Sequence, residues 1–309
     1  MKTLHEHLTD YLDYKLALNF SAETVTTTRR NCGRFFRWLA AHYEVVTAER
    51  LRKTQLQRWQ KHLAAWQTRK GTPLKARSIN KHIENVRGFL KYLAYHGHIA
   101  PSLVEALQYV KEPQMLPGSV LAHAEVRKML RRVDTTTPEG HRNRAMLELL
   151  YSSGIRVGEL LALDVDAVDL ANAAATVTGK GKKERVVPIG RTALRYTESY
   201  IVAVRSFLLH DPAERALFIH RGKRLGYQVF RRILRLAADR AKIDKPVSPH
   251  TFRRSCTTEL IRSGANMYHV KELLGHESLA TLKHYAKLTI LDLKKTHAKC
   301  HPREREDRR

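Results

Sequence analysis

A break near residue 115 is the feature that most constrains how this chain can fold. Residues 111–120 read KEPQMLPGSV, with two prolines and one glycine in ten residues. Proline lacks a backbone donor and glycine permits irregular backbone, so neither a helix nor a sheet continues through this stretch. The 309 residues are enough for two domains. We therefore place a linker at 112–120, between domains at 1–111 and 121–302, and a charged tail at 303–309.

The sequence before the linker is patterned for helices alone. Three stretches have apolar residues at steps of three and four, as a helix with one buried face requires. The first follows Ser21, a residue suited to cap a helix, and the second follows Thr54, where Gln57 completes a capping-box pattern. The third runs from about Ala76 to Tyr95, and Gly97 is placed to end it. We expect these residues in the core of a small bundle: Val25, Cys32, Phe35, Phe36, Leu39, Leu56, Trp59, Leu63, Trp66, Ile79, Ile83, Val86, Leu90 and Leu93.

Beyond the linker the pattern changes from helices alone to helices with a few strands. Two short strand-like runs, 173–177 and 184–189, flank the turn GKGKK at 179–183 and predict a β-hairpin. Helical patterns occur at about 123–132, 142–152, 192–209, 226–241, 250–263, 267–274 and 278–287. The predicted fold class is therefore mainly α, with an N-terminal helical bundle and a larger α+β domain that contains a small antiparallel sheet.

The charge of the chain points to a polyanionic partner. There are 56 Lys and Arg residues against 30 Asp and Glu residues, a formal net charge of +26. Such a field attracts nucleic acid. A membrane surface is the other polyanion, but no apolar run approaches the roughly 18 residues of a spanning helix, and no secretory signal opens the sequence. We expect a cytoplasmic, DNA-associated protein that does not bind membranes.

The sequence lacks the spacings that are typical of metal sites. Cys32, Cys256 and Cys300 are far apart and odd in number, which fits neither a disulfide framework nor a CxxC knuckle. The 17 histidines form no HExxH motif and no Cys/His cluster with zinc-finger spacing. We expect no metal and no other cofactor.

Cutting DNA without a metal makes specific demands on side chains. The reaction needs a nucleophile, fixed cations around the phosphate and an acid for the departing oxygen. Arginine suits the second role, because its planar guanidinium grips two phosphate oxygens and stays protonated.

Four stretches of the second domain carry such residues and resemble the tyrosine recombinases, the family of the phage integrases and Xer proteins. SSGIRVGELLAL at 152–163 is similar to the box of the first catalytic arginine. TGKGKKERVVPIG at 178–190 is similar to the family's β-hairpin, and SPHTFRRSCTTELIRSGA at 248–265 to its His-x-x-Arg box. LLGHESLATLKHYAKL at 273–288 is similar to the box of the nucleophilic tyrosine. The four stretches occur in the order that is typical of the family.

The resemblance implies a catalytic role for several side chains. Tyr285 would attack the scissile phosphate and form a 3′-phosphotyrosyl bond, which conserves the energy of the phosphodiester. Lys180 would protonate the departing 5′ oxygen, and Glu159 would have a supporting role. The remaining catalytic groups would be Arg156, His250, Arg253 and His276.

The resemblance also implies the fold of the first domain and the partners of the chain. The bundle is similar to the family's SAM-like core DNA-binding domain, and the substrate would be double-stranded DNA with specific recombination sites. Four protomers would assemble on synapsed DNA, starting from monomers in solution. Integration, excision, resolution and transposition all stay open. Candidate DNA contacts are Arg77, Lys81, Arg87, Gln228, Arg231 and Arg232.

Two alternative functions stay open beside the recombinase. A type IB topoisomerase uses a similar set of residues and would relax supercoils with no site preference. The compact basic domain before the linker favours the recombinase. A catalytically silent DNA-binding regulator would show at least one broken catalytic position, and the sequence shows none.

Overall fold

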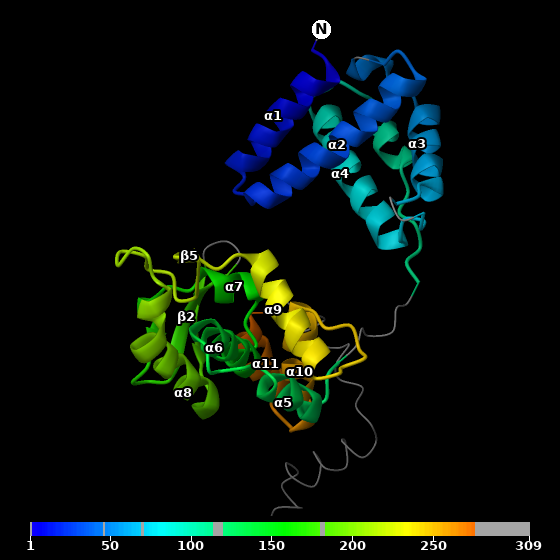
Figure 1. The fold of residues 1–309 in the computed structure, drawn as a ribbon. Helices are drawn as coiled ribbons and strands as arrows, with labels where there is room; N and C mark the ends of the chain where they lie inside the picture. The colour runs from blue at the N-terminus through cyan, green and yellow to red at the C-terminus, as the bar shows by residue number, and fades with distance from the viewer. Residues whose placement is uncertain (1, 46, 69–70, 114–119, 180–182, 276–309) are drawn as a thin grey trace, which may run out of the picture. The chain divides into compact units, whose positions relative to one another are not determined.

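The chain folds into two compact units, Met1–Met115 and Leu116–Arg309, which are described separately (Figure 1). The structure is a computed structural model. It describes residues 2–45, 47–68, 71–113, 120–179 and 183–275. Within these ranges, no helix has both the length and the apolar content needed to cross a membrane. The predicted helix at 278–287 and the tail at 303–309 lie outside them.

The described part of the first unit is a helical bundle, as predicted. Its helix α2 packs against both α1 and α4. Ser21 caps α2, since its Oγ accepts the N–H of Thr24 at 3.2 Å. The elements are α1 (Leu4–Ala17), α2 (Ala22–His42), η1 (Ala48–Arg50), α3 (Lys53–Ala65), α4 (Ala76–Tyr95) and η2 (Pro101–Ala106).

The start of α3 and the existence of α1 differ from the sequence prediction. The N-cap of α3 is Arg52, whose backbone N–H donates to Gln55 Oε1 at 2.8 Å. The predicted capping box of Thr54 and Gln57 is therefore wrong, because Gln55 already satisfies the helix end. Helix α1 was not predicted as a separate element. Its first turn is closed by Thr3 and Glu6, each bonding to the backbone N–H of the other.

The core of the first unit confirms the predicted apolar faces. All of the predicted core residues are buried except Trp66, which is half-buried. Phe35 packs against Trp59, with ring centroids 5.5 Å apart. A buried hydrogen bond of 2.8 Å from Thr28 Oγ1 to Asn85 Oδ1 also joins α2 to α4.

The second unit surrounds one hydrophobic core that includes Met146, Leu150, Val177 and Phe230. Its α-helices are α5 (His123–Arg131), α6 (Pro138–Ser153), α7 (Val157–Ala162), α8 (Arg191–Ser199), α9 (Tyr227–Arg240), α10 (Pro249–Arg262) and α11 (Met267–Leu274). Its strands are β1 (Val168–Asp169), β2 (Ala174–Thr178), β3 (Glu184–Pro188), β4 (Ile219–His220) and β5 (Lys223–Arg224). The short 3-10 turn η3 (Val165–Ala167) precedes β1.

The predicted hairpin is present and forms part of a larger sheet. Strands β2 and β3 pair antiparallel, with Ala174 opposite Pro188 and Thr178 opposite Glu184, and β1 pairs with the other edge of β2. A second hairpin, β4–β5, was not predicted. Both residues of its two-residue turn, Arg221 and Gly222, have positive φ, as a tight hairpin turn requires.

The single helix predicted at 192–209 is wrong in its second half. Helix α8 changes into a π turn, η5 (Tyr200–Val204), and then into the 3-10 turn η6 (Arg205–Leu208). Tyr200 is fully buried, its ring lies 5.6 Å from that of Phe218, and its hydroxyl accepts the N–H of Ile219 at 3.3 Å. The regular helix thus gives way at the residue whose side chain is anchored in the core.

Candidate active site

The corner between α6 and α7 positions the first predicted arginine. Helix α6 ends at Gly154, which has φ +62 and would bring a Cβ to 2.8 Å from Leu274 Cδ2. Both the left-handed backbone and this close approach favour glycine. Ile155 is then buried, and Arg156 becomes the N-cap of α7. The position of Arg156 is thus set by the turn at Gly154, the buried Ile155 side chain and the start of α7.

Glu159 joins Arg156 to strand β3. It accepts the backbone N–H and Nη1 of Arg156, both at 2.8 Å. It also accepts hydrogen bonds from Arg185 Nη1 at 3.0 Å and Nη2 at 2.8 Å, which form a bidentate ion pair. Burial of this carboxyl opposes its ionisation, but the hydrogen bonds from Arg185 and Arg156 outweigh burial and lower its pKa to about 2. Glu159, the predicted supporting residue, is therefore ionised at neutral pH and lies between two arginines.

The second predicted arginine, Arg253, is buried on α10. Its Nη1 donates to the carbonyl of Gly154 at 2.9 Å, and its Nη2 donates to the carbonyl of Leu274 at 2.6 Å. It therefore contacts the same Gly154 corner that leads into Arg156. The structure brings these two arginines together from segments almost a hundred residues apart in sequence.

Three arginines converge on the last carbonyls of α11. Arg185 Nε donates to Leu273 at 3.3 Å, Arg253 to Leu274, and Arg156 Nη2 to Gly275 at 2.8 Å. Carbonyls at a helix C-terminus lack intrahelical partners and carry partial negative charge, so cations are favoured there. Gly275, with φ +62, ends the helix. This arginine cluster, Arg156, Arg185 and Arg253, fixes the point where the chain enters the predicted tyrosine box.

His250 lies in the first turn of α10, and its side chain is exposed. Ser248 caps this turn, because its Oγ accepts the N–H of Thr251 at 3.1 Å. Arg253 follows His250 by three positions, so both lie on neighbouring positions of one helix face. Lys180, His276 and Tyr285 lie outside the described residues.

Sequence reasoning missed Arg185 as a member of this site. The residue stands in the hairpin stretch next to Glu184, where strand alternation gives no indication of a partner. Its side chain is only 18% exposed. The importance of Arg185 comes from its ion pair with Glu159, which is distant in sequence. The sequence therefore carries no signal for it.

The predicted DNA contacts have different environments. Arg77 is exposed on α4, and Lys81 is exposed but pairs with Glu84 at 3.0 Å. Arg87 instead donates to the carbonyl of Leu107 at 2.7 Å and stacks over Tyr109. On α9, exposed side chains are found at all three predicted positions. They are Gln228, Arg231 and Arg232.

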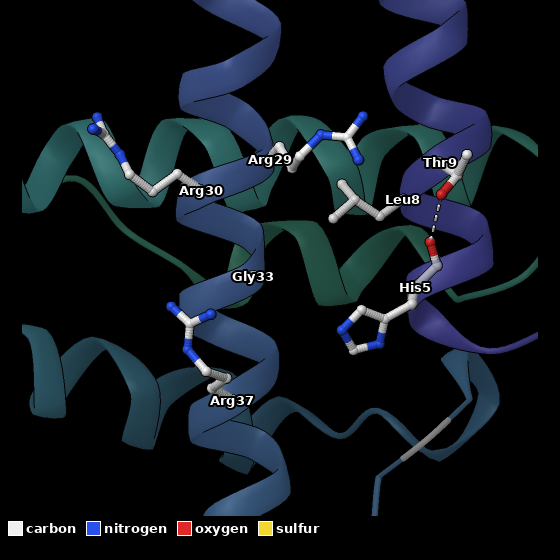
Figure 2. Close-up of a pocket in the computed structure, with 7 residues that line it drawn as sticks. All are labelled: His5, Leu8, Thr9, Arg29, Arg30, Gly33 and Arg37. Atoms are coloured by element: carbon white, nitrogen blue, oxygen red, sulfur yellow. Dashed lines mark hydrogen bonds between the residues drawn. The ribbon is translucent and has the colours of Figure 1, made fainter.

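Three arginines on α2 were also missed by the sequence predictions. Figure 2 shows Arg29 reaching towards α1 while Arg30 projects from the other side of α2. With Arg37, they line a cavity of about 370 Å³ that His5 and Leu8 close from α1. In the described part of the chain, Arg29, Arg30 and Arg37 have no carboxylate or carbonyl partner. The signal was available, since the three arginines lie close together in the sequence of one helix.

The sequence comparisons match the second unit and most of the first. A profile of the phage integrase family matches residues 119–290. Tyrosine recombinase XerD of Listeria monocytogenes is 38% identical over 231 residues, which are 74% of this chain and 77% of that protein. Tyrosine recombinase XerC 2 of Ralstonia nicotianae is 32% identical over 307 residues, or 98% of this chain and 88% of that protein.

Solved structures share the fold at low sequence identity. The Tn1549 transposon integrase, in complex with a circular intermediate DNA, is 14% identical with a TM-score of 0.73, over 97% of this chain and 99% of that one. The XerH site-specific recombinase, in a post-cleavage complex with its difH substrate, is 18% identical with a TM-score of 0.71, over 92% and 82% of the two chains. The family profile and the identities to the XerD and XerC 2 proteins establish that the chain belongs to the phage integrase family of tyrosine recombinases.

Proposed function

We propose that the chain is a site-specific tyrosine recombinase, which cleaves and rejoins DNA through a covalent 3′-phosphotyrosyl intermediate. One observation carries the proposal. Arg156 and Arg253, from separate segments, meet at the end of α11, where the stretch 273–288 that contains His276 and Tyr285 begins. Two guanidinium groups at one point can neutralise the charge that develops on a phosphate in the transition state.

The division of labour follows from the chemistry of each group. Arg156 and Arg253, with His276, hold the non-bridging oxygens of the scissile phosphate. His250, exposed on the same helix face as Arg253, assists proton transfer. Lys180 protonates the departing 5′ oxygen and Tyr285 attacks phosphorus, so that one P–O bond forms as another breaks. The rejoining step reverses these roles, with a 5′ hydroxyl of a second DNA as the nucleophile.

The helical unit supplies the DNA affinity in this proposal. Arg29, Arg30 and Arg37 on α2 contact phosphates, together with Arg77 on α4. Lysine and arginine contacts of this kind release counterions and make binding depend steeply on salt. Four protomers assemble on two synapsed sites. Relatives of the fold include a lambda integrase tetramer bound to a Holliday junction, 17% identical with a TM-score of 0.68, which supports this assembly.

The test is covalent trapping of the protein on nicked DNA. Wild type and Tyr285→Phe are incubated with suicide substrates that carry the repeats flanking the gene, with EDTA present, and the products are separated on denaturing gels. We expect an adduct with wild type only. EDTA makes the result independent of divalent metal, and Tyr285→Phe removes one hydroxyl while leaving the ring.

Three outcomes separate the candidate functions. An adduct on one repeat but not on scrambled DNA supports the recombinase. An adduct on every duplex, with supercoil relaxation, would indicate a topoisomerase-like enzyme. Binding with no adduct on any flanking repeat would indicate a DNA-binding regulator and contradict the proposal.

A further inference from the structure

Arg185 connects three separate parts of the second unit through one side chain. It stands on β3, and its Nη1 and Nη2 donate to the carboxylate of Glu159 on α7. Its Nε donates to the carbonyl of Leu273 at the end of α11. A guanidinium is rigid and planar, so the position of one partner fixes the directions of the other two. Substituting lysine would preserve the charge but not this geometry.

The packing around Gly275 gives a second and independent indication. A Cβ at this position would lie 3.0 Å from Arg185 Cζ and 3.1 Å from its Nε. The guanidinium therefore lies directly on the backbone of Gly275, the same residue whose carbonyl accepts Arg156 Nη2. Arg185 and Arg156 thus enclose both Glu159 and the end of α11.

From these contacts we infer that Arg185 is a positioning residue for strand cleavage, which holds Glu159, and through it Arg156, in register with the carbonyl end of α11. The inference rests on the proposed function, because it assigns Arg185 a part in that same reaction. Arg185 itself contacts no phosphate in this scheme. Its effect is on where Arg156 lies when the phosphate arrives.

The experiment compares single-turnover cleavage at saturating DNA, DNA affinity and melting temperature for Arg185→Gln and Arg185→Lys. Misplacing a reacting group by about 1 Å can cost about 100-fold in rate, and we expect a loss of this order for both variants, with DNA affinity within about twofold of wild type. Arg185→Lys keeps the charge next to Glu159, so it should remain folded even if Arg185→Gln does not.

A matched control is available in the same unit. Arg144 binds Glu148 at 2.8 Å and the carbonyl of Leu130 at 2.6 Å, and its side chain is 13% exposed. Arg144→Gln therefore removes a similarly buried ion pair and carbonyl contact, away from the predicted catalytic boxes. We expect it to lower the melting temperature while the cleavage rate at permissive temperature stays near that of wild type.

The double variant Arg185→Gln, Glu159→Gln tests the route of the effect. If Arg185 acts through Glu159, the double variant should cleave no more slowly than the slower single variant, because the two residues work as one unit. Losses that multiply, a rate for Arg185→Lys equal to wild type, or a loss that follows DNA affinity would each overturn the inference. Absence of an adduct with wild type would instead refute the proposed function itself.

Discussion

Arginines are used differently on helix α2 and around the end of α11. Arg29, Arg30 and Arg37 on α2 have no carboxylate or carbonyl partner among the described residues, whereas Arg156, Arg185 and Arg253 each donate to backbone carbonyls of their own chain. The first group keeps its charge available to a polyanion. The second group uses part of its hydrogen-bonding capacity to hold the fold in place. A net charge of +26 therefore overstates the number of side chains that can contact DNA.

The largest effect is expected from the arginine that is most deeply held. Arg253→Gln removes one of the cations that we propose bind the phosphate, and also its contacts with the carbonyls of Gly154 and Leu274. Loss of one charge-stabilising donor typically costs about 100- to 1,000-fold in rate, and we expect single-turnover cleavage to fall by at least this much. The measurement is adduct formation on the suicide substrate. Wild-type rates from this variant would place Arg253 outside the catalytic set.

Low pH should weaken the arginine cluster at the end of α11, because two of its members pair with Glu159. Its pKa is lowered from 4.5 to about 2 on folding, so its ion pairs stabilise the protein above the unfolded value and are lost as the pH falls from about 4.5 to about 2. The difference corresponds to about 3 kcal/mol. We expect the free energy of unfolding of Glu159→Gln to be lower than that of wild type by about this amount at neutral pH. The difference between the two proteins should become smaller as the pH falls towards about pH 3.

Urea unfolding at a series of pH values measures this gap. A matched control is Glu148→Gln, which removes another buried carboxylate that is paired with an arginine. A gap that stays constant with pH would mean that Glu159 does not carry the ion pairs described here.

Helix α2 should control the salt dependence of DNA binding instead of the chemistry. Replacing Arg29, Arg30 and Arg37 with glutamine should weaken binding and lower the slope of log K against log salt by about 0.9 for each phosphate that is no longer neutralised. At saturating DNA the cleavage rate should stay close to that of wild type. Fluorescence anisotropy at several salt concentrations measures the slope. An unchanged slope would show that α2 does not face DNA.

The smallest effect is expected at Lys81. Its ammonium pairs with Glu84 at 3.0 Å, and the carboxylate of Glu84 would repel a phosphate that binds at this position. Lys81→Gln should therefore change the salt slope less than Arg29→Gln does, although both remove one positive charge. Equal changes would mean that local pairing does not decide which cations are available to DNA.

The sequence predicted the helices well where one buried face repeats over several turns. Helix α4 begins and ends as predicted, and α9 and α10 are within one residue at each end. Periodicity fails for elements that depend on tertiary contacts. The β4–β5 hairpin has strands of two residues, too short for any alternation. The π turn begins at Tyr200, whose ring packs against Phe218, a contact that local periodicity does not reveal.

The residues of the candidate site also differ in whether local sequence could predict them. Arg156 and Arg253 were predicted because each lies in a recognisable motif. Arg185 was not, because its importance comes from Glu159 and Leu273, which are 26 and 88 residues away in sequence. The three arginines of α2 could have been noted, since Arg29, Arg30 and Arg37 lie close together in the sequence of one predicted helix.

The hydrogen bonds from three arginines to the end of α11 also limit how far the proposed nucleophile can lie from them. Tyr285 follows Gly275 by ten residues, and ten residues span at most about 35 Å even when fully extended. The proposed nucleophile therefore stays within that distance of Gly275, the residue whose carbonyl accepts Arg156 Nη2. The three arginines thus set an upper limit on the separation between Tyr285 and the groups that we propose bind the phosphate.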